Sequence, residues 1–308
     1  MPDGGPDFDA AVPPRGYRWW YVDALSDDGQ FGLTVIAFIG SVFSPYYAWS
    51  GWADPYAHCA VNVALYGPRG GRWAMTERGG GSLRRSRNAL IIGPSSLEWR
   101  NGELVVRINE VAAPIPRRIR GEFVITPHAV NREEFSLEAH DRHVWRPIAP
   151  MARASVRFDT PDIRWRGNAY FDTNAGDGPL QEAFSSWTWS RAALSDGAAV
   201  YYDVERRREP PLSLALRFDD AGAVKMLETP PVAPMAMTKW RLARRTRAEN
   251  GAATVLRSFE DTPFYSRSLI SSRFEGESVE WVHESLSLDR FANPIVRLML
   301  PFRMPRRG

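Results

Sequence analysis

The sequence predicts an all-β protein made of two tandem antiparallel domains, each a β-barrel or β-sandwich. Short segments rich in β-branched and aromatic residues recur along the whole chain, turn signals separate them, and helix signals are scarce. The length of 308 residues accommodates two domains of roughly 150 residues each. A hydrophobic content of 44% and a charged content of 24% are ordinary for a folded protein.

In the first half, residues 1–16 are rich in Pro, Gly and Asp and are expected to form a disordered lead. Tyr17–Ala24 and Gln30–Gly40 then predict a β-hairpin around Asp27-Asp28-Gly29. Asn101-Gly102 is a second hairpin turn. Further strands are expected at Cys59–Tyr66, Ala89–Ile92, Leu97–Arg100, Leu104–Asn109, Arg117–Ile125 and His143–Pro147.

The second half repeats this pattern. Strands are expected at Ala154–Asp159, Ile163–Thr173, Trp187–Ala192, Ala198–Val204, Leu212–Phe218, Val224–Leu227, Met237–Arg244, Thr254–Phe259, Tyr265–Phe274 and Glu280–Leu288. Weakly helical or irregular segments are expected at Ser44–Tyr56, Pro179–Ser186 and Ser287–Leu300. The proline-flanked stretch Pro147–Met151 suggests a boundary, so that the domains are expected to span residues 17–149 and 150–308.

Charge and cysteine content limit the classes of partner. The net charge is only +3 with acidic residues interspersed, which argues against nucleic-acid binding. All but two of the 39 basic residues are Arg, which fits either a GC-rich genome or a surface that meets phosphate groups. The single Cys59 allows no internal disulfide. Phe31–Phe43 is too short and interrupted to span a bilayer, so any membrane contact is expected to be peripheral.

The densest polar and aromatic cluster lies at residues 165–177. Tyr170, Asp172 and Asn174 share one face of the expected strand, because residues two apart point the same way. That face meets either solvent or a cavity. The neighbouring Trp187 and Trp189 also share a face, as either a structural tryptophan ladder or an aromatic wall that stabilises a cation.

Tyr201 and Asp203 lie on one face among apolar residues. Apolar surroundings disfavour the charged form of a carboxyl group, which makes Asp203 a candidate for a protonated acid. The alternative is a structural aspartate bonded to a backbone amide or an arginine. His283 lies beside Trp281, and Tyr46 and Trp49 belong to an aromatic group in the first half. A lone histidine is more often structural than functional.

No ligand spacing for a metal is visible, and the sequence lacks GxGxxG, P-loop and Gly-x-Ser-x-Gly motifs. We therefore expect neither a metal nor a nucleotide cofactor. The last residues, 297–308, mix apolar side chains with four arginines. They form either a solvated tail or a segment that rests on an anionic membrane surface.

Several segments together resemble the carotenoid 1,2-hydratases, also called hydroxyneurosporene synthases, over roughly residues 17–308. They are residues 38–49, 168–177, 184–191, 200–204, 257–267, 283–291 and 299–305. The resemblance implies a lipocalin-like fold of two β-barrel domains. It also implies cofactor-free hydration of the terminal C1,2 double bond of neurosporene or lycopene to a tertiary alcohol, in the cytoplasm at the photosynthetic membrane.

Alkene hydration needs an acid that protonates carbon and a water that captures the cation. From the sequence we expect Asp203 as the acid, oriented by Tyr201, with Asp172 and Asn174 positioning water. We expect the carotene to be contacted by Trp187, Trp189, Tyr170, Tyr46, Trp49 and His283. Two alternatives remain open at this point, a lipid carrier without activity and another isoprenoid enzyme such as a cyclase.

Overall fold

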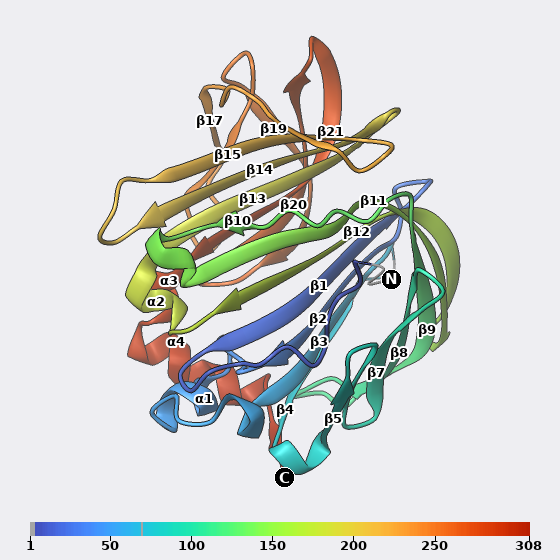
Figure 1. Cartoon of the computed structure of the whole chain (residues 1–308), viewed down its shortest axis with the longest axis vertical. Helices are drawn as coiled ribbons and strands as arrows, with labels where there is room; N and C mark the ends of the chain where they lie inside the picture. Colours follow the sequence, from blue (N-terminus) through green and yellow to red (C-terminus); the bar gives the residue numbers. More distant parts are fainter. Residues whose placement is uncertain (1–3, 69) are drawn as a thin grey trace. The chain divides into compact units, whose positions relative to one another are not determined.

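The computed structural model describes residues 4–68 and 70–308 and confirms the all-β prediction (Figure 1). The chain divides into two compact units, which we describe separately. Unit 1 runs to Pro179 and also contains Leu298–Gly308, and unit 2 is Leu180–Arg297. Within the described ranges, no helix is both long and apolar enough to cross a membrane.

Unit 1 is built on one large curled sheet, which is antiparallel except for the parallel pair of β22 and β4 (Figure 1). Its strands follow the order β22-β4-β3-β2-β1-β12-β11-β9-β8-β7-β6-β5, with β10 on the side of β11. Their bounds are β1 (Tyr17–Ser26), β2 (Gly32–Ile39), β3 (Cys59–Tyr66), β4 (Arg72–Arg78), β5 (Leu83–Ser86), β6 (Ala89–Ile92), β7 (Ser95–Arg100), β8 (Glu103–Val111), β9 (Arg118–Pro127), β10 (Phe135–Ser136), β11 (His143–Thr160), β12 (Asp162–Gly176) and β22 (Arg306–Arg307). The short helix α1 (Pro45–Trp49) follows β2.

The alternation of side chains along β1 and β12 gives this sheet two different faces. Trp20, Val22 and Ala24 of β1 point into the hydrophobic core of unit 1, together with Ala169 and Phe171 of β12. The residues between them point to the opposite face. That opposite face carries the polar and aromatic cluster described below.

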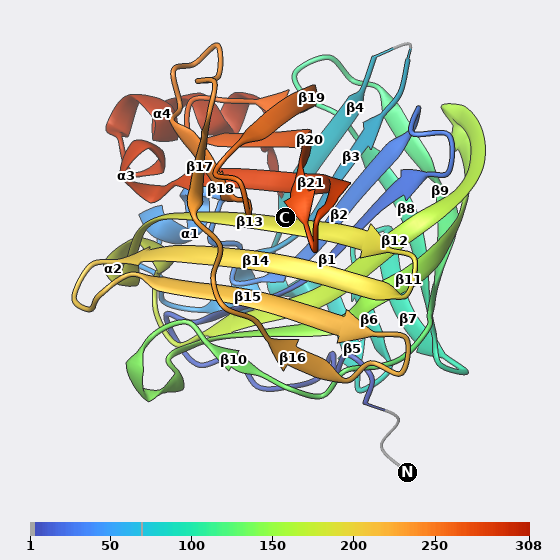
Figure 2. The same ribbon diagram turned by 90° about the horizontal axis from the view of Figure 1, so that it is seen from above.

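Unit 2 contains a seven-stranded sheet and a two-stranded ribbon (Figure 2). The sheet order is β16-β15-β14-β13-β21-β20-β19, formed by β13 (Phe184–Leu194), β14 (Gly197–Arg206), β15 (Leu212–Asp219), β16 (Val224–Met226), β19 (Ala253–Asp261), β20 (Tyr265–Phe274) and β21 (Glu277–Ser287). The ribbon pairs β17 (Val232–Met235) with β18 (Arg244–Arg247), and the helices are α2 (Leu180–Ala183) and α3 (Leu288–Phe291). A further helix, α4 (Pro294–Met299), contains the point at which the chain passes back to unit 1. Tyr201, Ile270, Phe274 and Trp281 form the centre of its core.

Most expected strands are present. Cys59–Tyr66 matches β3 at both ends, and Asn101 and Gly102 both have positive φ, as the predicted tight turn between β7 and β8 requires. Strand β4 (Arg72–Arg78) was not predicted, because its polar residues obscure the alternation.

The expected boundary at Pro147–Met151 lies inside β11, and the two units instead divide after Pro179. The β11–β12 register shifts between Arg146 and Ala152, which marks β-bulges in this part of the strand. The prolines fit there because proline has no backbone N–H, and some residues at a bulge make no hydrogen bond to the neighbouring strand. The chain also returns to unit 1 at Leu298.

The expected disordered lead differs from the structure in its described part, residues 4–16. Phe8 and Val12 are buried in the core of unit 1, and the Phe8 ring meets the Trp20 ring edge-on at 5.1 Å. The Trp20 indole N–H donates a 2.9 Å hydrogen bond to the Pro6 carbonyl. Residues 1–3 lie outside the described residues.

Candidate active site

Two Tyr-x-Asp segments face each other on neighbouring strands of unit 1. Tyr21 and Asp23 lie on β1, and Tyr170 and Asp172 lie on β12. The antiparallel register places Tyr21 opposite Asp172 and Asp23 opposite Tyr170. Directly paired residues point to the same side of a sheet, so all four side chains share the face that is turned away from the core. All four are buried.

Asp172 is held by two hydrogen bonds that converge on one of its oxygens. The Tyr170 hydroxyl donates to Oδ2 at 2.8 Å, and the Trp145 indole N–H of β11 donates to the same atom at 2.9 Å. Two donors saturate the two lone pairs of a carbonyl oxygen. A proton on this carboxyl group therefore resides on Oδ1, which is the arrangement that a carboxylic acid needs in order to donate.

The tyrosine of this segment remains a donor at any physiological pH. Burial, followed by the charge and hydrogen bond of Asp172, raises the pKa of Tyr170 well above its ordinary value. Its hydroxyl group therefore keeps its proton and fixes the orientation of the carboxyl group.

His143 extends the cluster along β11. Its Nδ1 is hydrogen-bonded to the Tyr17 hydroxyl at 3.0 Å, and its Nε2 lies 3.6 Å from Oε2 of Glu138. Burial lowers the pKa of His143 to about 4, so the imidazole is neutral near pH 7. Asn174 lies opposite Trp145 in the β11–β12 register and is also buried. His143, Trp145 and Asn174 thus share the face of Asp172.

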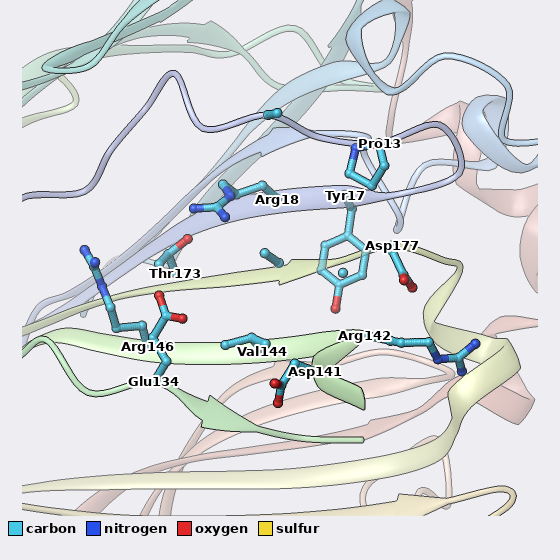
Figure 3. Close-up of a pocket in the computed structure, with 13 residues that line it drawn as sticks. Pro13, Tyr17, Arg18, Glu134, Asp141, Arg142, Val144, Arg146, Thr173 and Asp177 are labelled. Atoms are coloured by element: carbon cyan, nitrogen blue, oxygen red, sulfur yellow. The ribbon is translucent and has the colours of Figure 1, made fainter. Parts of the chain in front are cut away.

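A hollow of about 240 Å³ lies beside Tyr17, the hydrogen-bond partner of His143, and Figure 3 draws the residues that line it. The Tyr17 side chain points into it, and the other lining residues include Arg18, Arg146, Glu134 and Thr173. A lining this rich in charge suits water and ions rather than a hydrocarbon. We do not place an apolar substrate in it.

The structure separates the residues that we expected to act around Asp203. The carboxylate of Asp203 forms a two-pronged ion pair with Arg247, in which Nε is 3.0 Å from both oxygens and Nη2 is 2.7 Å from Oδ1. The Ser213 hydroxyl donates to Oδ1 at 2.5 Å. Both oxygens of this carboxyl group are therefore occupied by donors from neighbouring side chains. Asp203 therefore fits the structural alternative, with Arg247 as the arginine, better than the role of a proton donor.

Tyr201 and His283 also occupy the core of unit 2. The Tyr201 ring stacks on Trp281 at a centroid distance of 4.6 Å, and burial raises the pKa of its hydroxyl group. His283 lies between two serines, with Nδ1 at 2.8 Å from the Ser190 hydroxyl and Nε2 at 2.9 Å from the Ser285 hydroxyl. Burial lowers the pKa of His283 to about 3, so it is a neutral part of a closed polar network.

Trp187 and Trp189 point to the other face of the same sheet. In the β13–β14 register, Thr188 is opposite Asp203 and Trp189 is opposite Tyr202. The two tryptophans therefore share a buried face with Tyr202, while Asp203 points to the opposite face. They do not form an aromatic wall around Asp203.

Tyr46 and Trp49 form an edge-to-face pair on α1, with a centroid distance of 5.6 Å. Trp49 is exposed, and the guanidinium of Arg306 lies 5.9 Å from the Tyr46 ring centre. Across the part of the chain that the structure describes, no group of three or more His, Cys, Asp or Glu side chains is placed to hold a metal ion.

Sequence reasoning selected Tyr170, Asp172 and Asn174 but missed Trp145, His143, Tyr21 and Asp23. The His-x-Trp spacing of His143 and Trp145 was a usable signal, because in a strand it places both side chains on one face. The second Tyr-x-Asp segment on β1 was another such signal.

Comparison with known proteins gives a consistent result. The family model "Carotenoid hydratase CrtC" matches residues 35–308. The acyclic carotenoid 1,2-hydratase of Thiocapsa roseopersicina is 53% identical over 312 residues, covering 100% of this chain and 77% of the relative. That of Rubrivivax gelatinosus is 51% identical, covering 99% and 77%. The crystal structure of kievitone hydratase from Nectria haematococca shares the fold, with a TM-score of 0.54, 9% identity and 92% coverage of each chain.

Proposed function

The chain belongs to the carotenoid hydratase family, and on this premise we propose that it adds water to the terminal C1,2 double bond of an acyclic carotene of the neurosporene or lycopene type. The product is a tertiary alcohol at C1, and the enzyme is a hydro-lyase. The proposal is supported by family membership over most of the chain and by one structural observation, the buried carboxyl group of Asp172 with two donors on Oδ2.

In this mechanism Asp172 is the acid. Its Oδ1 proton is transferred to C2 of the trisubstituted alkene, the π electrons form the new C2–H bond, and a tertiary cation develops at C1. Tyr170 and Trp145 keep Oδ1 directed at the substrate through their bonds to Oδ2. The face of the Trp145 ring is electron-rich and stabilises the positive charge. Water then adds to C1 and loses one proton, which gives the tertiary alcohol; the buried Asn174 amide lies on the same face.

Replacing Asp172 tests this assignment. Asp172→Asn keeps the shape of the side chain and removes the transferable proton, so hydration is expected to fall by about 100-fold or more. The assay incubates purified protein with lycopene in detergent micelles and follows the mass gain of one water by mass spectrometry. The matched control is Asp159→Asn, an exposed aspartate on β11. Hydration at the wild-type rate in Asp172→Asn would exclude Asp172 as the acid.

The same assay separates this function from the two alternatives. A carrier binds lycopene and returns it with unchanged mass. A cyclase returns an isomer of the same mass with an altered absorption spectrum. Neither alternative has a structural observation that favours it over hydration.

We further propose that the protein meets its substrate at the cytoplasmic surface of the membrane through residues 298–302 of unit 1. This segment comprises the end of α4 and the following turn, and exposes Leu298 at 65% and Phe302 at 71% of their surface. Arg303 follows directly, with its guanidinium 4.8 Å from the Trp73 ring centre. Exposed apolar side chains beside arginines suit the interface of an anionic bilayer.

Flotation with vesicles of phosphatidylglycerol and phosphatidylcholine tests this contact. Phe302→Ser combined with Leu298→Ser is expected to weaken vesicle binding by roughly tenfold, because two large side chains no longer enter the interface. Met226→Ser, at another exposed apolar position, is the control. Equal binding by the double variant and the control would refute this surface.

A further inference from the structure

Asp23 is a second buried carboxyl group on the face of Asp172. It lies on β1, is 0% exposed, and accepts a 3.1 Å hydrogen bond from the Tyr21 hydroxyl. It is a diagonal neighbour of Asp172 across the strand pair, a relation that places the two Cα atoms about 7–8 Å apart. Tyr170, which donates to Asp172, is directly opposite Asp23.

Thr34 of β2 flanks Asp23 on the other side. The β1–β2 register places Thr34 directly opposite Asp23, so their side chains point to the same face. Thr34 is 4% exposed, and its hydroxyl makes no hydrogen bond to any residue in the described part of the chain. A buried hydroxyl without a partner costs free energy. One water between Thr34 and Asp23 would satisfy the Thr34 hydroxyl group, since it accepts from that hydroxyl and donates to the Asp23 carboxylate.

We propose that Asp23 is the general base of the hydration and that Thr34 positions the attacking water. This inference rests on the proposed function. When Asp172 has protonated C2, a lone pair of the water held by Thr34 forms the new C1–O bond. Asp23 takes a proton from that water as the bond forms, so the alcohol leaves neutral, with Asp172 ionised and Asp23 protonated.

The cycle closes when Asp23 has lost its proton and Asp172 has regained one. Tyr170 is directly opposite Asp23 and donates to Oδ2 of Asp172, so Oδ1 is the oxygen that takes up the proton. Loss of the proton from Asp23 to water and uptake of a proton from water at Oδ1 of Asp172 restore the starting state, and no proton is gained or lost over the cycle. In this inference the pair holds one proton between turnovers, on Asp172.

The two roles are separated by running the reaction in D₂O. Without a base, the cation formed by Asp172 loses a hydron from C2 again instead of capturing water. Asp23→Asn is therefore expected to lower hydration of lycopene by about 100-fold or more. Deuterium is still expected to enter C2 of the recovered lycopene, at a rate within about tenfold of the rate at which the wild type forms the cation. Asp172→Asn is expected to lose both hydration and exchange.

Thr34→Val provides a second variant that keeps both carboxyl groups. It matches threonine in size and removes only the hydroxyl, so the ratio of deuterium exchange to hydration is expected to rise at least tenfold with an unchanged circular dichroism spectrum. This variant decides the question if Asp23→Asn does not fold.

The outcomes distinguish this inference from the function on which it rests. Wild-type hydration with an unaltered exchange ratio in Asp23→Asn and Thr34→Val refutes the base. Loss of both exchange and hydration in folded Asp23→Asn assigns it the acid's role and also refutes the inference. A wild-type protein that neither hydrates nor exchanges any acyclic carotene overturns the proposed function, and this inference with it.

Discussion

The ion pair of Asp203 and Arg247 offers a direct test of which aspartate performs the chemistry. Asp203→Asn removes the negative charge and leaves Arg247 facing a neutral amide in the core of unit 2. The guanidinium makes three contacts with the carboxylate at 2.7–3.0 Å, and Asp203 is only 5% exposed. If Asp203 is structural, the substitution lowers stability and leaves the chemistry intact.

The magnitude follows from burial. Breaking one side of a fully buried ion pair costs about 3–5 kcal/mol, because the remaining charge is left uncompensated. The Arg247 side chain is 18% exposed, so water partly compensates it and the lower end of about 3 kcal/mol applies. At roughly 2–4 °C per kcal/mol, the unfolding temperature is expected to fall by about 6–12 °C.

The assay combines thermal unfolding with initial rates of lycopene hydration at 20 °C, normalised to folded protein. Asp203→Asn is expected to keep at least half of the wild-type rate per folded molecule. The double variant Asp203→Asn, Arg247→Met is expected to recover much of the lost stability, because it leaves no uncompensated charge. A stable Asp203→Asn protein without activity would return Asp203 to the mechanism and refute this reasoning.

Two further predictions concern the hydrogen bond from Tyr170 to Asp172 and the two buried histidines. Tyr170→Phe removes a donor from Oδ2 of Asp172, so kcat for hydration is expected to fall by about tenfold or more while the protein stays folded, measured by initial rates and calorimetry. Acid is expected to destabilise the fold, because His143 and His283 have pKa values of about 4 and about 3 when folded and near 6.5 when unfolded. As the pH falls, the histidines of the unfolded chain therefore take up protons first. The contribution of the two neutral histidines to stability is complete above about pH 6.5 and is lost towards pH 4, with the free energy of unfolding falling by up to about 2.7 kcal/mol per pH unit. Urea unfolding at pH 7 and pH 5.5 measures this slope, which His283→Gln is expected to halve; an unchanged slope contradicts the assignment.

Strand alternation was enough to predict part of the site. The two-residue period placed Tyr170, Asp172 and Asn174 on one face, and the β1–β12 register confirms it. It was equally correct within unit 2, where Trp187 and Trp189 share a face and Tyr201 and Asp203 share a face.

The alternation of side chains does not predict the register between neighbouring strands. Trp189 pairs with Tyr202 and not with Tyr201, so the tryptophans and Asp203 point to opposite faces. A shift of one residue would have reversed this relation. Likewise, β12 pairs with β1, almost 150 residues earlier in the chain, and the opposition of Asp172 and Tyr21 exists only once that long-range pairing is known.

The repeated Tyr-x-Asp pattern explains how a sheet holds two carboxyl groups apart and still couples them. In an extended strand, residues two apart lie about 7 Å from each other on one face, a separation that a tyrosine spans to reach the next carboxyl group. Both tyrosines do so, at 3.1 Å on β1 and 2.8 Å on β12. Because the strands are antiparallel, each tyrosine is also placed opposite the other strand's aspartate. The tyrosine that orients one carboxyl group is therefore also the direct cross-strand neighbour of the second.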